Sequence, residues 1–348
     1  MLYRVYLEHI AEPANLERAL LSALEWLRWE DIIPPGCRVF IKPNLTWREH
    51  LPGVTVTPQF LAALVRAIKL RTPNISIGEA DGGYNGYPVE EAFRGHGLYR
   101  IAEEERIGLV NLTKMPSEVV TGVVAGRAIS VRLPSCLLHD VDVFISVPVP
   151  KVHAMTGVSL GLKNQWGCIP SAMRLHEHPE FCEKIVLINK LLRPRLTVFD
   201  GTYFLDKTGP LVGEAVPMRL LVASDNVGAG SLACCRIMQI DPAGVKHLAM
   251  ASAEGLGPVD MAEVATNQPI EPFCERKFRL RRSLVNRVAL GAFHNRAFNN
   301  LLYDSSFADC AHRLLYSVRR NRRLARVLYG SSGPPAVEGR RVHSFGAD

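Results

Sequence analysis

One strand-like run and the segment after it constrain the fold of this chain more than any other feature. The run Val141–Val147 is rich in Val, Ile and Phe, which is typical of a strand buried on both faces of a parallel sheet. It passes directly into 148–167, a segment with two lysines, a histidine, an asparagine and several glycines. Ligands of open α/β sheets bind just outside the carboxyl ends of strands. The sequence therefore predicts a parallel sheet with a binding site at this strand end.

Other strand-like runs alternate with helix-like segments along the chain. Val39–Ile41 and Ile75–Gly78 have strand character, and Gln59–Leu70 between them has helical periodicity. Such alternation predicts βαβ units with right-handed crossovers. We therefore expect an α/β fold, doubly wound, with a mainly parallel sheet. The alternating run 118–133 predicts a β-hairpin insertion.

Charge divides the chain into two parts. From Arg276 onward there are 15 Lys and Arg residues against 4 Asp and Glu residues, whereas the preceding part has 26 basic and 30 acidic residues. We expect an α/β domain over 1–275, a basic amphipathic helical extension over 276–330 and a flexible tail over 331–348. One helix of the extension is predicted over Phe278–Phe293, and its arginines are expected to form a positive face separate from the binding site.

Composition excludes several classes of protein. With 47% hydrophobic and 22% charged residues, the chain is globular rather than disordered. No apolar run approaches the roughly 18 residues of a membrane-spanning helix, and the start has no secretory signal. We expect a cytoplasmic protein, with a peripheral position at the membrane as the alternative. The eight cysteines form no Cys-x-x-Cys pair, so no iron–sulfur cluster is expected.

Polar side chains follow five of the predicted strands. If all five strands are parallel, their carboxyl ends meet at one edge of the sheet, and we expect their side chains in one crevice. Lysines close to carboxylates suit an anionic substrate, acid–base chemistry, or a divalent metal held by carboxylate and imidazole. The residues of this crevice are Lys42, Asn44, Glu79, Asp81, Lys151, His153, Asp200 and Asp225.

Candidate roles follow from residue type. Lys151, His153 and Lys163 are the candidate catalytic residues. His176 and Asp200 are candidate metal ligands, although Asp200-Gly201 and Asp81-Gly82 also fit simple turns; His176 and His178 would face apart on a helix. The candidate substrate-binding residues are Lys42, Asn44, Glu79, Asp81, Asn164 and Asp225. No phosphate-binding loop, dinucleotide fingerprint or serine-hydrolase motif is present, so the cofactor stays open.

The order of these motifs resembles that of the domain-of-unknown-function family 362. The resemblance covers about residues 36–258 and rests above all on Lys42-Pro43-Asn44, Lys151 with His153, and Leu162-Lys163-Asn164. It implies an architecture but no assigned activity. Many members carry an added ferredoxin-like domain with two iron–sulfur clusters, whose cysteines this chain lacks. Gly230 stands where the family usually has a second aspartate after Asp225, so chemistry that needs that aspartate would be altered here.

Three functions are compatible with these features. The first is an enzyme, suited to a biosynthetic pathway, that acts on a small anionic or carbonyl-bearing substrate; lysines would stabilise negative charge and His153 would transfer a proton. The second, suggested by the resemblance, is a redox-partner or metal-handling protein. The third is a scaffold or peripheral membrane protein whose arginine-rich extension binds anionic lipid or a protein partner. Nucleic acid is not an expected partner, because no binding module is recognisable.

Overall fold

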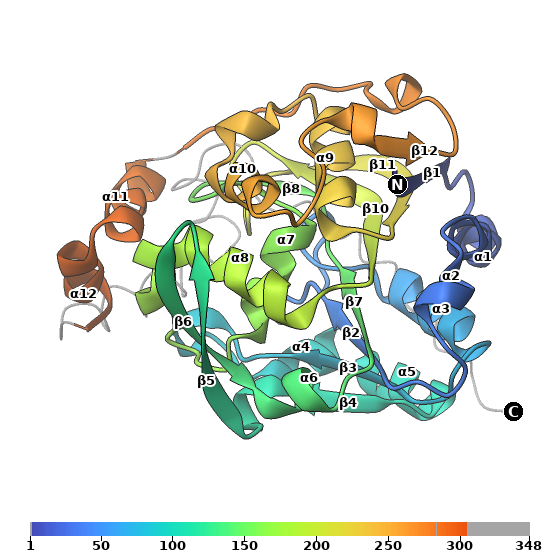
Figure 1. Ribbon diagram of the computed structural model, residues 1–348, viewed down its shortest axis with the longest axis horizontal. Coiled ribbons are helices and arrows are strands. Elements are labelled where there is room, and N and C mark those ends of the chain that lie inside the picture. The colour runs from blue at the N-terminus through green and yellow to red at the C-terminus, as the bar shows by residue number, and fades with distance from the viewer. Residues whose placement is uncertain (1, 283, 305–348) are drawn as a thin grey trace, which may run out of the picture.

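The centre of the protein is a mixed sheet with helices on both faces (Figure 1). The computed structural model describes residues 2–282 and 284–304, and ten strands of this part form the sheet. Eight of them lie in the order β12-β1-β11-β10-β7-β2-β3-β4, and β8 joins β10 and β9 off this path. The strands are β1 (Tyr3–His9), β2 (Val39–Pro43), β3 (Ile75–Glu79), β4 (Gly108–Asn111), β7 (Val143–Val147), β8 (Lys151–His153), β9 (Gly157–Ser159), β10 (Leu196–Asp206), β11 (Glu214–Ser224) and β12 (Val264–Thr266).

The helices mostly connect successive strands. They are α1 (Leu16–Trp26), α2 (Trp29–Ile32), α3 (Pro58–Lys69), α4 (Val89–Gly95), α5 (Leu98–Glu105), α6 (Ser135–His139), α7 (Gly161–Asn164), α8 (Phe181–Leu192), α9 (Val227–Ile237), α10 (Lys246–Ala253), α11 (Leu284–His294) and α12 (Arg296–Asp304). A 3₁₀ helix, η5 (Arg174–Glu180), precedes α8. None of the helices described is long and apolar enough to cross a membrane.

The prediction of a mainly parallel α/β sheet is confirmed. β10, β7, β2, β3 and β4 are all parallel, so the runs expected to share a sheet do so. Side chains of β2 alternate between the two faces: Ile41 belongs to the core that contains Leu64 of α3, whereas Phe40 belongs to the core that contains Ile185 of α8. Two apolar cores, one on each face, therefore hold the sheet between its helical layers.

One expectation about strand direction is wrong. β11 runs antiparallel to β10, and Ser224 at its end pairs with Thr197 at the beginning of β10. Asp225 therefore lies at the opposite edge of the sheet from the ends of the parallel strands. Its carboxylate accepts a hydrogen bond from the backbone of Arg4 in β1 (2.9 Å).

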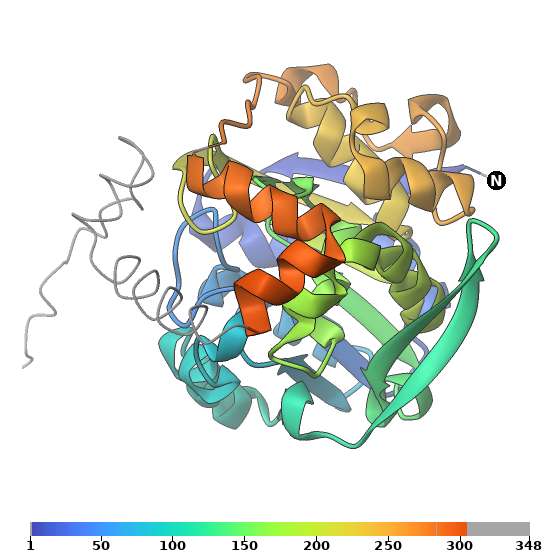
Figure 2. The ribbon, with the colours of Figure 1, turned by 90° about the vertical axis from the view of Figure 1, so that its left-hand side faces the viewer.

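The predicted hairpin is present as a separate two-stranded sheet. It consists of β5 (Ser117–Val124) and β6 (Arg127–Pro134), and it lies along α8 (Figure 2). A side chain at Gly122 would collide with Leu187 of α8, because its Cβ would lie 2.5 Å from the leucine side chain. Glycine therefore allows this close approach of the hairpin to the helix.

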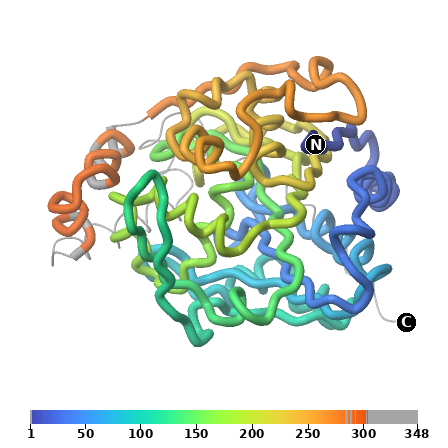
Figure 3. Tube along the Cα trace, viewed as in Figure 1, coloured from blue at the N-terminus to red at the C-terminus, as the bar shows by residue number. Residues whose placement is uncertain are grey.

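The C-terminal extension differs from the prediction at its beginning. The segment before α11 is not helical: Phe278 is buried against Phe204, with ring centres 5.7 Å apart, and the backbone of Arg279 donates to Asp206 (2.8 Å). Figure 3 shows this segment crossing the molecule between β12 and α11. The apolar core takes up Phe278, so the helix expected from Phe278 begins only at Leu284. The expected helices beyond Asp304 and the tail 331–348 lie outside the described residues.

Candidate functional site

A cavity of about 600 Å³ lies at the carboxyl ends of the parallel strands. Its wall combines the strand ends, the segment after β7, η5 and the C-terminal helices. Six of the predicted site residues line it: Asn44, Glu79, Lys151, His153, Lys163 and Asn164. Lys42 and Asp81 lie directly behind the wall, since Lys42 is paired with Glu79 and the Asp81 carbonyl accepts a hydrogen bond from Arg174. The three candidate catalytic residues thus share one cavity, and their chemical roles stay predictions.

Behind the cavity wall, Lys42 and Glu79 form a buried ion pair. The Lys42 Nζ to Glu79 Oε2 distance is 2.5 Å, and Lys42 also donates to the Pro43 carbonyl (2.8 Å). The other oxygen of Glu79 accepts from the backbone of Ala80 (3.0 Å). The two charges are therefore matched, and the carboxylate is committed to groups of the protein itself.

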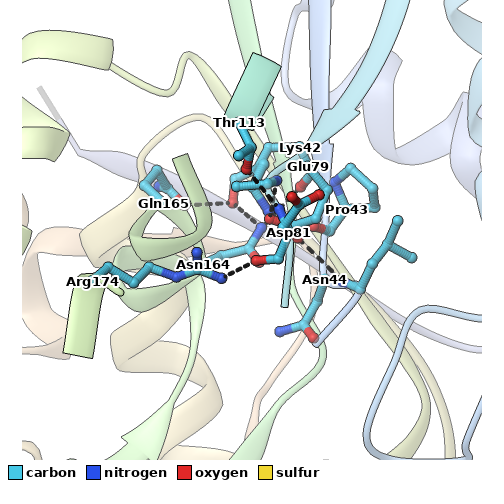
Figure 4. A network of polar contacts seen from close by, with 12 residues as sticks. Lys42, Pro43, Asn44, Glu79, Asp81, Thr113, Asn164, Gln165 and Arg174 are labelled. Carbon is cyan, nitrogen blue, oxygen red and sulfur yellow. Dashed lines mark hydrogen bonds and ion pairs between the residues drawn. The ribbon is translucent and has the colours of Figure 1, made fainter. Parts of the chain in front are cut away.

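A network of amides fixes the position of this pair (Figure 4). Asn164 of α7 donates to the carbonyl of Lys42 (2.8 Å) and to Ser146 of β7 (3.0 Å). Ser146 in turn donates to Gln165 (3.0 Å), whose amide donates to Asn189 of α8 (2.8 Å). The α7 turn is thereby tied to the ends of β2 and β7, which gives the neighbouring Lys163 a fixed backbone.

Lys151 is a buried lysine of a different kind. Its side chain is 1% exposed, and its amine donates to Asn44 Oδ1 (3.2 Å) and to the Val54 carbonyl. Burial, and after it the charge of Lys163, lower the pKa of Lys151 well below its usual range. In its neutral form this amine has two N–H donors and one lone pair, so the two acceptors would leave the lone pair available.

His153 is held as one neutral tautomer. Its Nδ1 accepts from the backbone N–H groups of Met155 (3.2 Å) and Thr156 (3.4 Å), so the hydrogen resides on Nε2. Burial, followed by the charges of Lys163 and Lys151, lowers the pKa of His153 well below its usual range. The ring therefore offers Nε2–H as a hydrogen-bond donor.

Lys163 and Arg174 add positive charge to the same wall. Lys163 Nζ lies 6.0 Å from the centre of the Phe181 ring, and burial, followed by the charge of Arg174, lowers the pKa of Lys163 to about 8. Arg174 is buried and donates to the carbonyls of Ser171 (3.0 Å) and Asp81 (2.7 Å). Among the described residues, no carboxylate forms an ion pair with either cation.

Aromatic side chains form much of the remaining wall. The His178 ring lies 4.8 Å from Phe293 and 5.9 Å from Trp166, measured between ring centres. Burial, with a smaller effect of Lys163, lowers the pKa of His178 to about 3. The aromatic lining residues are Trp47, Tyr84, Tyr87, Trp166, Phe181, Phe293 and Tyr303. The cavity thus offers a cationic part and an apolar part to one ligand.

The C-terminal helices are part of the cavity, whereas the expectation concerned only their arginines, none of which lines it in the described part of the chain. Asn286, Ala289 and Phe293 of α11 and Tyr303 of α12 line the wall, and α11 and α12 lie across η5 (Figure 2). Phe293 is 5% exposed and packs on Phe181, with ring centres 5.2 Å apart. Apolar packing of α11 therefore completes the site, whereas the sequence drew attention to its arginines.

The two candidate metal ligands do not line the cavity. Asp200 accepts from the backbone of Thr57 (2.6 Å) and from Thr202 Oγ1 (2.6 Å), which fixes the chain before α3. His176 faces the Tyr303 ring, with ring centres 6.1 Å apart. Within the described part of the chain, no group of three His, Cys, Asp or Glu residues is placed to hold a metal ion.

The surroundings of two further positions, Asp81 and Gly230, are explained by the fold. Asp81 Oδ1 accepts from the backbone of Val89 at the start of α4 (2.8 Å), as expected for a turn residue. A Cβ at Gly230 would lie 2.6 Å from the Phe199 ring, so Phe199 occupies the space that an aspartate side chain would need.

The sequence did not single out Arg174 and considered His178 only together with His176, as a possible metal ligand, yet both Arg174 and His178 line the cavity. The spacing of His176 and His178 predicts that the two side chains face apart on a helix. In η5 they do have different surroundings, and only His178 lines the cavity. The cis peptide bond between Gly209 and Pro210 lies in the same wall, and no sequence pattern indicated it.

Comparison with known proteins gives a family and several distant relatives. Residues 39–236, more than half of the 348 residues, match the family described as Domain of unknown function (DUF362), which confirms the resemblance seen in the motifs. The chain is 28% identical over 263 residues to a thylakoid-associated protein of Synechocystis sp., covering 71% of this chain and 77% of that protein.

Among solved structures, the chain is similar to the lactate racemase apoprotein from Thermoanaerobacterium thermosaccharolyticum, with a TM-score of 0.47 and 16% identity. The match covers 69% of this chain and 57% of the racemase chain. A protein from Thermotoga maritima matches with a TM-score of 0.37 and 16% identity, over 55% of this chain and 51% of that one.

Proposed function

For a chain that belongs to the DUF362 family, we propose an enzyme that binds a small anionic or carbonyl-bearing substrate and acts on it by lysine and histidine acid–base chemistry. One observation carries the proposal: Lys151, His153, Lys163 and Arg174 line a single cavity whose lining carboxylate, Glu79, is already paired with Lys42. This excess of basic over acidic side chains in the cavity wall is counted among the residues that the structure describes.

The charges of the cavity favour an anionic ligand. A buried cation is costly unless an anion pairs with it. Arg174 donates only to carbonyl groups among its described partners, and Lys163 packs near an aromatic ring. A substrate carboxylate would supply the missing negative charge, and its apolar part would contact the aromatic wall.

The neutral bases supply the chemistry. A lysine amine with a lowered pKa accepts a proton near neutral pH, and a neutral imidazole N–H donates a hydrogen bond to a developing oxyanion. Burial lowers the pKa of both Lys151 and His153, and the two residues belong to the same strand, β8. We assign proton abstraction to Lys151 and stabilisation of the substrate oxygen to His153.

Ligand binding tests the charge argument. Benzoate and the neutral benzamide have almost the same shape, so we expect benzoate to bind by calorimetry at least tenfold more tightly. Arg174→Gln should remove most of this difference. Arg193→Gln should leave it unchanged, because Arg193 is an exposed arginine that donates to a backbone carbonyl (3.2 Å). Equal binding of benzoate and benzamide, or no binding of either at millimolar concentration, contradicts the proposal.

Hydrogen exchange tests the chemistry. In D₂O the methyl hydrogens of pyruvate exchange after proton abstraction, and proton NMR follows the loss of their signal. We expect the protein to accelerate this exchange, and His153→Gln to slow it at least tenfold while benzoate binding persists. Unchanged exchange in His153→Gln would remove His153 from the reaction.

Peripheral membrane association is a second candidate. The Synechocystis relative is named as thylakoid-associated, and Arg279, Arg281 and Arg287 are exposed in the described part of the extension. Each basic side chain near anionic lipid contributes about 1 kcal/mol. We expect salt-sensitive sedimentation with phosphatidylserine vesicles but not with phosphatidylcholine vesicles. No sedimentation with the anionic vesicles at low salt contradicts this candidate.

A further inference from the structure

We infer that Lys163 forms a covalent imine with an aldehyde or ketone that also carries a carboxylate, inside the cavity at the strand ends. The inference rests on the proposed function, because it concerns the same cavity, and it adds the residue that bonds to the substrate and the class of compound. The observation that carries it is the difference between the three lysines at this edge of the sheet.

The amine groups of Lys42 and Lys151 have protein partners. Lys42 is held by Glu79 at 2.5 Å and by the Pro43 carbonyl at 2.8 Å. Lys151 is almost fully buried and donates to Asn44 and to the Val54 carbonyl. To attack a carbonyl carbon, Lys42 would have to leave these partners, and Lys151 would have to move away from the two acceptors that hold its almost fully buried amine in place.

Lys163 has different surroundings. It is half-buried in the cavity wall, and its Nζ lies 6.0 Å from the centre of the Phe181 ring. No residue of 2–282 or 284–304 gives its amine a carboxylate or a carbonyl partner. Because burial and the charge of Arg174 lower its pKa to about 8, roughly a tenth of the protein carries neutral Lys163 at pH 7. A neutral, accessible amine beside other cations is the usual nucleophile for imine formation.

The groups needed for the reaction line the same cavity. The lone pair of neutral Lys163 attacks the carbonyl carbon, and the carbonyl oxygen takes a proton, giving a carbinolamine. The nitrogen then loses a proton, the hydroxyl group takes one and leaves as water, and the C=N bond forms. One water is released for each imine and nothing is oxidised or reduced. His153 and Lys151 line the same cavity, and their Nε2–H and amine groups would donate and accept these protons.

Arg174 gives the reaction its specificity. Its guanidinium is buried in the cavity wall and is oriented by the Ser171 and Asp81 carbonyls. A carboxylate paired with Arg174 would bring a carbonyl on the same small molecule close to Lys163. The resulting imine withdraws electrons from the adjacent carbon, which makes the proton there easier for Lys151 to remove.

Reductive trapping tests the inference on the full chain. The probe is 4-carboxybenzaldehyde with sodium cyanoborohydride at pH 7.5, and peptide mass spectrometry locates the reduced adduct. We expect Lys163 to be modified at least tenfold faster than the buried Lys42 and the exposed Lys277. Benzaldehyde, which lacks the carboxylate, should show a much smaller preference, and benzoate should slow the labelling of Lys163.

Each outcome supports or contradicts the imine at Lys163, the anionic site, or both. Labelling that prefers Lys151, or that does not prefer any lysine, overturns the inference. If benzoate binds but Lys163 is not labelled, the imine is excluded while the anionic site stands; if benzoate does not bind either, both fail. Lys163→Arg keeps the positive charge, so it should retain benzoate binding and lose the adduct. The mapping is made on the unmodified sequence and so does not depend on a variant that folds.

Discussion

Lys42 and Lys163 lie at the same edge of one sheet, but their surroundings are opposite in kind. Lys42 is fully buried, and its charge is matched by Glu79 and fixed by an amide network. Lys163, directly before Asn164 of the same network, lines a cavity with other basic groups and an aromatic ring. The difference shows that lysines after strands can have unlike partners, and we propose that Lys42 serves the fold and Lys163 a ligand.

The largest expected effect concerns the matched pair. Glu79→Gln leaves the buried Lys42 ammonium without its anion, so the free energy of unfolding should fall by about 3 kcal/mol or more in urea denaturation. The exposed pair between Arg28 and Asp31 (3.1 Å) is the control, because Asp31→Asn should change it by less than about 1 kcal/mol. A loss at Glu79 no larger than at Asp31 would mean that the buried pair does not stabilise the fold.

A smaller effect is expected from crowding the same pair. A Cβ at Gly167 would lie 2.9 Å from Lys42 Nζ and would also press on Glu79, so Gly167→Ala should cost about 2 kcal/mol. Gly244→Ala is the matched control, since nothing lies within 4 Å of its Cβ position. Thermal unfolding of both variants measures the difference. Equal melting temperatures would show that the pair can move without cost, which would weaken its contrast with Lys163.

Local patterns predicted the sheet well because buried strands appear in the sequence as short apolar runs. Val39–Ile41 and Val143–Val147 became neighbouring parallel strands. The direction of β11 could not be predicted in this way, because an apolar run has the same pattern whether its strand is parallel or antiparallel to its neighbour. Asp225 was therefore placed at the wrong edge of the sheet.

The site was predictable where it follows strands and not where it depends on distant packing. Lys151, His153 and Lys163 come from one continuous segment, so their common cavity follows from local sequence. Arg174 and Phe293 enter the cavity through η5 and α11, and no local pattern shows where these elements dock. The partner of Lys42 is Glu79, 37 residues further along, so the sequence could not separate the paired lysine from the others.

Acid should reveal a buried neutral histidine beside the cavity, His247, whose ring centre lies 5.9 Å from that of Phe181. Burial, and after it Lys163, lower the pKa of His247 to about 3, whereas an unfolded histidine titrates near 6.5. Between these values the unfolded chain binds more protons, so stability falls as pH falls. His247→Phe should remove about 1 kcal/mol of the loss between pH 6.5 and 5.5, because Phe does not titrate. Urea denaturation at both pH values measures this; an unchanged pH dependence would mean that His247 is protonated in the folded protein.

The smallest expected change in stability distinguishes the two lysines most directly. Lys163→Met removes a cation that has no carboxylate among its described partners, so the free energy of unfolding at pH 7 should stay the same or rise by less than about 1 kcal/mol. The folded pKa of about 8 lies below that of an unfolded lysine, so the unmodified protein should gain stability between pH 8 and 10, and the variant should not. Lys277→Met, at an exposed position, is the control in urea denaturation. A loss of about 3 kcal/mol, like that expected for Glu79→Gln, would mean that Lys163 stabilises the fold as Lys42 does, and the contrast between the two lysines would not hold.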